Sequence, residues 1–319
     1  MIAKAELHCH LEGSISPALA RELGRRNGVA FPDGMFSPEG HYVWRDFLSF
    51  LDAYDRVCLG VLTAKDFGDV IYAYLASIAR QGAVYAEIFC SPERASQRGM
   101  SYAEWLAGLT AGVERARREF GIEGRVIIIC IRHLGPERAL KMAEDMVAEP
   151  HPLVVGFGMG GDEAKFTPAD FAPAYRLVAD KGLGCTVHAG EVCGPESVWA
   201  ALQALPVTRI GHGVRSIEDP RLVAELARRG TVLEVCPGSN IALGLYPDRA
   251  RHPLRRLIEA GVRVTLNSDD PPFFHTTLGR EYDEAGLSDQ ELLGITRTAI
   301  EASFADEATK KRLLREKVK

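Results

Sequence analysis

Two histidines near the amino terminus, His8 and His10, have the spacing of a metal-binding pair. They end a short apolar segment that we expect to form a β-strand. Residues i and i+2 of an extended chain point to the same side, so both imidazoles can reach one metal ion while Cys9 points away. This pair alone is weak evidence for a metal site. The positions of the other candidate ligands in the sequence decide whether the two histidines bind a metal.

Eight short runs rich in β-branched residues recur along the chain, bounded by turn residues and separated by helical patterns. This arrangement is typical of the buried parallel strands of βα units. The predicted strands are residues 3–7, 84–89, 125–131, 153–159, 184–187, 209–211, 232–235 and 262–267. Predicted helices include residues 102–120, 136–147, 169–181, 195–204 and 220–229. Eight such units in 319 residues predict an α/β fold, a (β/α)8 TIM barrel forming a single domain over residues 1–319.

A long helical insertion, residues 16–80, separates the first two predicted strands. It contains an aromatic segment that predicts a helix packed by Phe47, Phe50, Leu51 and Tyr54. The same segment could also cover the mouth of the barrel, since covers of active sites are often helical insertions with one apolar face toward the ligand. The two interpretations are compatible.

Polar residues follow only some of the predicted strands, and in such barrels the functional groups stand at the carboxyl ends of strands. These residues are His8 and His10 after the first strand, Gly161 after the fourth, His188 and Glu191 after the fifth, His212 after the sixth, and Asp269 and Asp270 after the eighth. The other histidines lie mostly in helical or loop contexts and are left outside the predicted site: His41, His133, His151, His252 and His275.

Three imidazoles and one carboxylate, from His8, His10, His188 and Asp269, form a donor set that suits Zn²⁺ and leaves one position open. Zinc lowers the pKa of a bound water toward neutrality and so supplies a nucleophile. Barrels with two metals often bridge them by a lysine from the fourth strand. Here the first lysine after that strand is Lys165, beyond a Gly-Gly turn, so we expect one zinc ion per chain.

Three further residues at the strand ends can act on a substrate or on water. Glu191 lies three residues beyond His188 and could be either a structural carboxylate or a general acid or base. His212 lies between two glycines and could orient or deprotonate the water. Asp270 neighbours the expected ligand Asp269 and could accept a hydrogen bond from water or substrate.

These residues occur in motifs that resemble those of the adenosine/adenine deaminase family of the amidohydrolase superfamily, in order and spacing over essentially the whole chain. The motifs are His8-Cys9-His10-Leu11-Glu12-Gly13, Gly161-Asp162-Glu163, His188-Ala189-Gly190-Glu191, Gly211-His212-Gly213 and Ser268-Asp269-Asp270-Pro271. The resemblance implies zinc-dependent hydrolytic deamination at C6 of a 6-aminopurine. It also implies zinc ligation by His8, His10, His188 and Asp269, in agreement with the donor set above.

The resemblance also implies a role for each remaining residue. Glu191 would protonate N1 of the purine, and His212 and Asp270 would position the nucleophile. Asp270 would also meet N7, and the N–H of Gly161 would meet N3. His10 and Glu12 are implied to face the substrate as well.

The exact 6-aminopurine depends on positions where the chain departs from the family pattern. Glu12 stands where nucleoside deaminases commonly have Asp, and Glu is frequent in relatives that take a free base or a modified nucleoside. Gly211 matches the nucleoside enzymes, and Gly158 replaces a usual aspartate. We expect adenosine and 2′-deoxyadenosine as substrates, giving inosine and 2′-deoxyinosine plus ammonia; adenine or another 6-aminopurine is the alternative.

Composition narrows the classes of partner. The net charge of −5, with acidic and basic residues interspersed, offers no positive field for nucleic acid. Polynucleotide deaminases combine His-x-Glu with a later Pro-Cys-x-x-Cys, and this chain has no Pro-Cys-x-x-Cys motif. Seven cysteines without paired spacing, no signal-peptide pattern and no apolar run long enough for a membrane predict a cytoplasmic protein with free thiols. A homo-oligomer is left open.

Two other functions remain open at this point. One is hydrolysis of an amide, lactone or phosphoester by a mononuclear metal site on the same barrel. The other is a non-catalytic metal-binding or ligand-binding protein that keeps the fold. Retention of Glu191, which metal binding does not require, speaks against the second.

Overall fold

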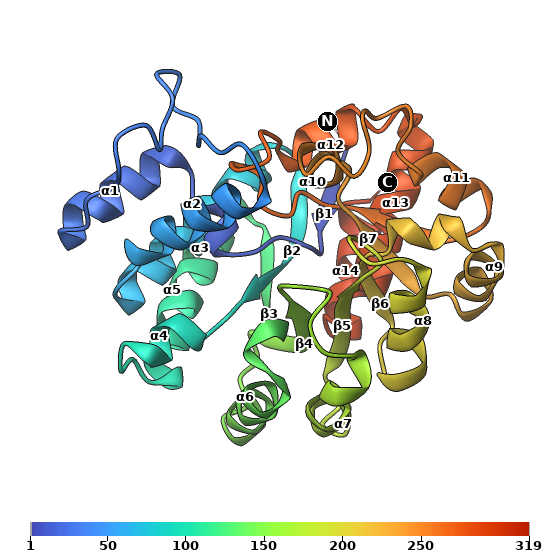
Figure 1. Ribbon diagram of the computed structural model, residues 1–319, viewed down its shortest axis with the longest axis horizontal. Helices are drawn as coiled ribbons and strands as arrows, with labels where there is room; N and C mark the ends of the chain where they lie inside the picture. Colours follow the sequence, from blue (N-terminus) through green and yellow to red (C-terminus); the bar gives the residue numbers. More distant parts are fainter. Residues whose placement is uncertain (1, 319) are drawn as a thin grey trace.

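Eight parallel strands, each paired with the next along the chain, form a barrel in the computed structural model of the protein (Figure 1). The structure describes residues 2–318, without the side chains of residues 47 and 48. The strands are β1 (Lys4–Glu6), β2 (Ala83–Cys90), β3 (Glu123–Ile131), β4 (Val154–Gly160), β5 (Gly184–Ala189), β6 (Arg209–His212), β7 (Val232–Val235) and β8 (Arg263–Leu266). The predicted (β/α)8 TIM barrel is confirmed, and all eight strands lie where the sequence places them to within three residues.

Helices surround these strands (Figure 1). They are α1 (Pro17–Asn27), α2 (Phe47–Leu59), α3 (Ala64–Arg80), α4 (Glu93–Gln97), α5 (Tyr102–Phe120), α6 (Pro136–Ala148), α7 (Ala172–Ala179), α8 (Pro195–Ala204), α9 (Pro220–Arg229), α10 (Pro237–Ala242), α11 (Leu254–Glu259), α12 (Leu278–Asp283), α13 (Asp289–Ala302) and α14 (Glu307–Glu316). Four short 3₁₀ helices join them: η1 (Glu12–Ser14), η2 (Arg132–Leu134), η3 (Pro168–Phe171) and η4 (Val214–Glu218).

The helix predicted at residues 169–181 is wrong at its start. The chain forms η3 over Pro168–Phe171, and α7 begins only at Ala172. Pro173 explains the break, because proline lacks the N–H that a continuing helix needs and is tolerated in the first turn of a new one.

The insertion between β1 and β2 consists mainly of α1, α2 and α3 (Figure 1). Helix α2 packs toward the carboxyl end of β8: Phe50 lies 5.6 Å from Phe273 and 5.1 Å from Phe274 between ring centroids, and Tyr54 lies 5.6 Å from Phe273. The predicted packing role of Leu51 is wrong, because this side chain is exposed, and the side chain of Phe47 lies outside those described. The insertion therefore packs against a loop at the barrel mouth, as a cover would.

The barrel closes between β8 and β1 just beyond the ends of both strands. The N–H of Asp269 donates to the carbonyl of His8 (3.0 Å), and the N–H of His10 donates to the carbonyl of Asp269 (3.1 Å). Two histidines of the first motif and one aspartate of the last are thereby joined through their backbones.

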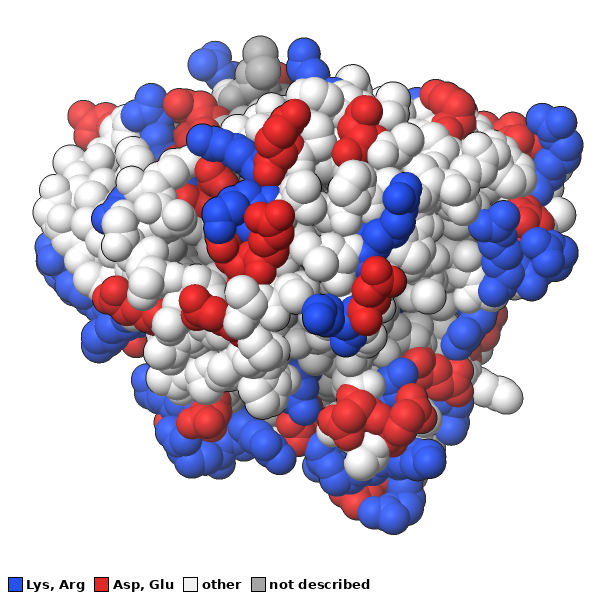
Figure 2. Space-filling model, turned by 90° about the horizontal axis from the view of Figure 1, so that it is seen from below, with Lys and Arg blue, Asp and Glu red and all other residues white. Residues whose placement is uncertain are grey.

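The surface carries charges of both signs. Figure 2 shows acidic and basic side chains intermingled on one face, with broad uncharged areas between them. No helix among the described residues has the length and apolarity needed to cross a membrane.

Candidate active site

Four imidazoles and an aspartate converge at the carboxyl ends of β1, β5, β6 and β8. The Nε2 atoms of His10 and His188 lie 3.2 Å apart. Oδ1 of Asp269 lies 3.5 Å from Nε2 of His10 and 3.8 Å from Nε2 of His8. The structure thus brings together all four residues that the sequence assigns to a metal.

Glu191 and His212 lie on the same cluster. Oε2 of Glu191 is 3.5 Å from Nε2 of His212, which is 3.8 Å from Oδ2 of Asp269. The side chain of His8 is fully buried, whereas those of His10 and Glu191 are 17% and 15% exposed. Solvent therefore reaches the cluster from the side of His10 and Glu191.

Two of these residues have an unusual backbone. His212 (φ 58°) and Asp269 (φ 63°) adopt the left-handed conformation, which is uncommon for residues with a side chain. Such conformations persist only where the surrounding structure holds them, and they concentrate at functional sites. At Asp269 the two backbone hydrogen bonds that close the barrel supply that constraint.

The ring of His8 is prepared for metal binding. Its Nδ1 lies 2.8 Å from Oε2 of Glu234 and donates to that carboxylate, which leaves a lone pair on Nε2. Nε2 is buried and has no hydrogen-bond partner among the described residues. Burial lowers the pKa of His8 to about 3, with Arg209 adding to the effect, and lowers the pKa of His10 to about 3, with His8 adding to it. The rings are therefore neutral, as ligands must be, and the set fits a divalent transition metal.

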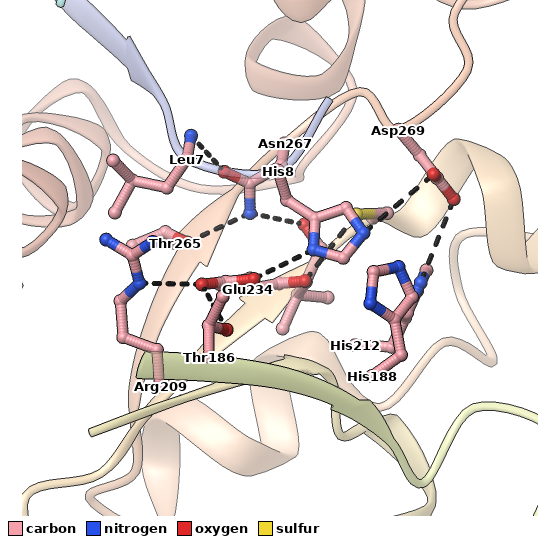
Figure 3. A network of polar contacts seen from close by, with 12 residues as sticks. Leu7, His8, Thr186, His188, Arg209, His212, Glu234, Thr265, Asn267 and Asp269 are labelled. Atoms are coloured by element: carbon pink, nitrogen blue, oxygen red, sulfur yellow. Dashed lines mark hydrogen bonds and ion pairs between the residues drawn. The ribbon is translucent and has the colours of Figure 1, made fainter. Parts of the chain in front are cut away.

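Glu234 belongs to a buried polar network that was not predicted from the sequence (Figure 3). Its Oε1 accepts hydrogen bonds from Oγ1 of Thr186 (2.9 Å) and Nε of Arg209 (2.6 Å), and Arg209 also donates to Oε2 of Glu87 (2.6 Å). Hydrogen bonds from a second residue orient a ligand histidine and tune its basicity. The sequence feature that could have indicated this network is a single charged residue, Glu234, within the otherwise apolar run Val232–Val235.

Cys236, just beyond β7, is a second residue that the sequence did not assign. Its Sγ lies within 4.8 Å of candidate ligand atoms of His8, His212 and Asp269. Burial raises the pKa of this thiol well above its usual range, and Sγ donates to the carbonyl of Glu234 (3.5 Å). The thiol thus already has a hydrogen-bond partner in β7, whereas His8, His10 and His188 form a second group of converging side chains whose neutral imidazoles bind a metal without losing a proton.

Glu163, in the turn after β4, holds the loop that carries Glu191. Its carboxylate accepts hydrogen bonds from four consecutive backbone N–H groups, of residues 190–193, at 2.5, 3.2, 2.8 and 2.9 Å. It also accepts one from Oγ of Ser197 (2.6 Å). Arg132 ties the turn to β5 by donating to the carbonyls of Glu163 (3.0 Å) and His188 (2.7 Å). The sequence motif around Gly161 contained Glu163, but only the contacts reveal its part in the site.

Glu191 itself has the environment of a carboxylic acid. Burial raises its pKa well above the usual range, and the nearby carboxylates of Asp269 and Glu163 add to the effect. Its Oε1 is buried and has no hydrogen-bond partner in the part of the chain that the structure describes. This atom is available to a ligand.

Glu12, Gly13 and Asp270 form the neighbouring wall. A Cβ at Gly13 would lie 1.6 Å from Oδ1 of Asp270, so only glycine permits this contact. Burial raises the pKa of Glu12 to about 7. Oδ1 of Asp270 is another buried atom with no partner among the described residues.

The five histidines left outside the predicted site do not form part of the cluster of four imidazoles. His41 and His275 contact each other, with ring centroids 5.3 Å apart, and His133 lies beside the turn at Gly161. His252 is different from the rest: its Nε2 contacts the amide of Asn240 (3.1 Å), which in turn contacts His212 (3.3 Å). Sequence position alone gave no signal for this link.

An eight-stranded parallel barrel with imidazoles and carboxylates gathered at the strand ends is the architecture of the metal-dependent barrel hydrolases. Within that class, the model of the adenosine deaminase family matches residues 3–319, and the chain belongs to this family. It is 50% identical over 317 residues to a protein named adenine deaminase from Sinorhizobium medicae, covering 98% of this chain and 97% of that protein.

Solved structures that resemble this chain support the same family assignment. The adenine deaminase of Arthrobacter aurescens superposes with a TM-score of 0.92 at 32% identity, covering 99% of this chain and 98% of that one. An amidohydrolase from Burkholderia ambifaria with bound zinc gives a TM-score of 0.89 at 28% identity, covering 99% and 89%. The chain is therefore a hydrolase that deaminates a purine at a C–N bond, and the resemblance read from its motifs is confirmed.

Proposed function

We propose that this protein is a zinc-dependent adenine deaminase, which converts adenine and water to hypoxanthine and ammonia. The observation that carries the proposal is the set of His8, His10, His188 and Asp269 gathered beside Glu191. The name of the relative at 50% identity supports adenine as the substrate. Adenosine and 2′-deoxyadenosine, the substrates expected from the sequence, become the alternative.

Gly211, which matches the nucleoside enzymes, has a steric explanation and therefore does not favour a nucleoside substrate. A Cβ at this position would lie 2.8 Å from Cε1 of His8 and 3.3 Å from Cα of His188. Glycine is thus required by the packing of the histidines, whichever purine is bound.

Gly158 is accounted for in a similar way. A Cβ there would meet Cγ2 of Thr186 at 3.3 Å and Cγ2 of Ile127 at 3.5 Å. A carboxylate at this position would displace Thr186, which donates to Glu234. The floor beneath the site is therefore built around Thr186, without the aspartate that is usual in the family.

The donor set of three imidazoles and one carboxylate favours zinc. When bound, zinc would act as a Lewis acid and lower the pKa of a water beside the substrate. The chain's own residues then act on the purine: Glu191, protonated in its buried setting, donates to N1 and draws electron density from C6. The N–H of Gly161 donates to N3, and His212 orients the attacking water. Burial raises the pKa of Asp270 well above its usual range, with Asp269, Glu191 and Glu12 adding to the effect, so its protonated carboxyl donates to N7.

The reaction is tested by incubating purified, zinc-loaded protein with adenine, adenosine and 2′-deoxyadenosine in parallel and measuring ammonia release. Adenine should give the highest kcat/KM. A higher value for adenosine would favour the nucleoside alternative, and no ammonia from any of the three would contradict the proposal. Elemental analysis of protein expressed in metal-replete medium should find about one zinc per chain.

A further inference from the structure

Two buried side chains, Asn240 and His252, form a line behind His212, on the side of the ring away from Glu191 and Asp269. The amide of Asn240 lies between Nδ1 of His212 (3.3 Å) and Nε2 of His252 (3.1 Å). At its far end, Nδ1 of His252 accepts the backbone N–H of Leu254 (3.2 Å). His212, Asn240 and His252 are at most 5% exposed, so water does not compete for these hydrogen bonds.

The direction of every hydrogen bond follows from the backbone N–H, which can only donate. Because Nδ1 of His252 accepts from Leu254, this nitrogen carries a lone pair, and the ring proton must be on Nε2. Nε2 of His252 therefore donates to Oδ1 of Asn240. The NH₂ group of Asn240 then points to Nδ1 of His212 and donates to it.

The opposite orientation of the Asn240 amide is excluded. If the amide of Asn240 were reversed, its NH₂ group would face Nε2 of His252, and both nitrogens of that ring would have to accept while neither carried a proton. A protonated His252 is also disfavoured: burial lowers its pKa to about 3, with Arg249 and Arg256 adding to the effect. The backbone of Leu254 thus fixes the orientation of the amide.

We propose that Asn240 and His252 are positioning residues that lock His212 in the tautomer with its proton on Nε2. This nitrogen faces Oε2 of Glu191 (3.5 Å) and Oδ2 of Asp269 (3.8 Å), so His212 presents an N–H to the reaction centre. His212 then orients the attacking water as a hydrogen-bond donor, and its Nε2 has no lone pair with which to act as a base. The proton of the water goes instead to Oδ2 of Asp269, the carboxylate oxygen that faces His212, while Oδ1 faces His8 and His10.

This inference deepens the proposed function and rests on it for the catalytic meaning of the tautomer. The tautomer itself is measured without substrate, by ¹H–¹⁵N correlation spectra of the zinc-loaded protein labelled with ¹⁵N in its histidine rings. His151 is an internal reference, because its Nδ1 also accepts a backbone N–H two residues ahead, from Leu153 (3.1 Å). It precedes β4, at the opposite end of the barrel. The wild-type ring of His212, identified by its loss in His212→Gln, should carry its proton on Nε2.

Asn240→Asp supplies the decisive variant. A carboxylate can only accept from both rings, so His212 should move its proton to Nδ1 while His252 and His151 keep theirs on Nε2. Zinc content should not change, and kcat for adenine should fall about 10²–10³-fold, the loss expected when one preorganised donor is removed. KM should change far less.

His252→Leu tests the same line if Asn240→Asp does not fold, with His151→Leu as its matched control. Loss of the His252 donor frees the amide to rotate, so His212 should show both tautomers and kcat should fall, while His151→Leu alters neither. A wild-type His212 with its proton on Nδ1 would overturn the proposal. So would an Asn240→Asp protein in which the tautomer changes and kcat does not. Because the spectra need no substrate, a correct tautomer together with inactivity on adenine would count against the proposed function and not against the lock.

Discussion

Nδ1 of His8 lies 2.8 Å from Oε2 of Glu234, which connects a candidate metal ligand to a charged network inside the barrel (Figure 3). Glu234→Gln weakens the acceptor that orients the His8 ring, so we expect metal affinity to fall about 10–100-fold. Competition with a chromophoric chelator measures this affinity directly.

Glu87→Gln is the matched control for this variant. Glu87 is the other carboxylate that binds Arg209, through Nη1 at 2.6 Å, and among the described residues no hydrogen bond or ion pair joins it to His8. Both variants disturb the buried ion pairs and should lower the free energy of unfolding. Only Glu234→Gln should lower metal affinity as well. An equal loss of metal affinity in both variants would refute the orienting role of Glu234.

Glu163 holds the loop of residues 190–193 through four backbone hydrogen bonds, so its loss should displace Glu191. A glutamine offers one acceptor oxygen in place of two, and we expect Glu163→Gln to reduce kcat about 10²-fold, as misplacement of a catalytic group by about 1 Å can. Glu196→Gln is the control, since this exposed carboxylate accepts only the N–H of Gly194 (3.0 Å) among the backbone groups of the same loop.

A double-mutant cycle separates positioning from general damage to the fold. If Glu163 acts through Glu191, Glu163→Gln should cost almost nothing in kcat when Glu191 is already glutamine. The same fold-loss in both backgrounds would show that Glu163 supports the structure without positioning Glu191.

Much of the scaffold could be predicted from the sequence because its signals are local. The bounds of β7 match the prediction, as do those of α8 and α9, each of which opens with a proline in its first turn. Strand-end polar residues could be found because the carboxyl ends of parallel strands meet at one rim. Knowing which strands end in His or Asp was therefore enough to assemble the candidate ligands.

The missed residues depend on partners that are distant in the chain. Glu234 and Arg209 lie within predicted strands, and nothing local shows that they bind each other or that Glu234 binds His8. Glu163 was visible as part of a motif, but its partners are backbone groups, which carry no sequence signal. The same holds for His252, which is linked to the site through the amide of Asn240 and whose tautomer is set by the backbone N–H of Leu254.

The protonation of Glu191 should govern the pH dependence of turnover. Burial, with Asp269 and Glu163 nearby, raises its pKa, and a general acid works only while it is protonated. Activity should therefore hold below the pKa of Glu191 and fall as the pH rises through it. In Glu191→Gln, kcat/KM for adenine should be lower by about 10²–10⁴-fold and this alkaline limb should vanish. A variant that keeps the limb would exclude Glu191 as its source.

Helices α3 and α5 cross at glycines, which makes their packing sensitive to one methyl group. A Cβ at Gly108 would lie 2.0 Å from the carbonyl oxygen of Ala64. We expect Gly108→Ala to lower the free energy of unfolding by roughly 1–3 kcal/mol, as overpacking does. Gly294 in α13 has open space around its Cβ position, so Gly294→Ala should raise stability by about 0.5–1 kcal/mol. Urea denaturation of both variants measures the contrast, and a loss of stability in both would contradict the packing argument.

The length of Glu12 should decide between a free base and a nucleoside. The side chain of Glu12 is buried beside Gly13, which packs directly on Asp270. Additional space for a ribose can therefore be gained mainly by shortening the side chain of Glu12. Glu12→Asp removes one methylene, and we expect the ratio of kcat/KM for adenosine to that for adenine to rise roughly tenfold or more, the scale of discrimination by one methylene. Glu12→Gln keeps the length and removes the charge, so it should leave the ratio nearly unchanged. If the glutamine variant shifts the ratio as far as the aspartate variant does, charge and not length sets the preference.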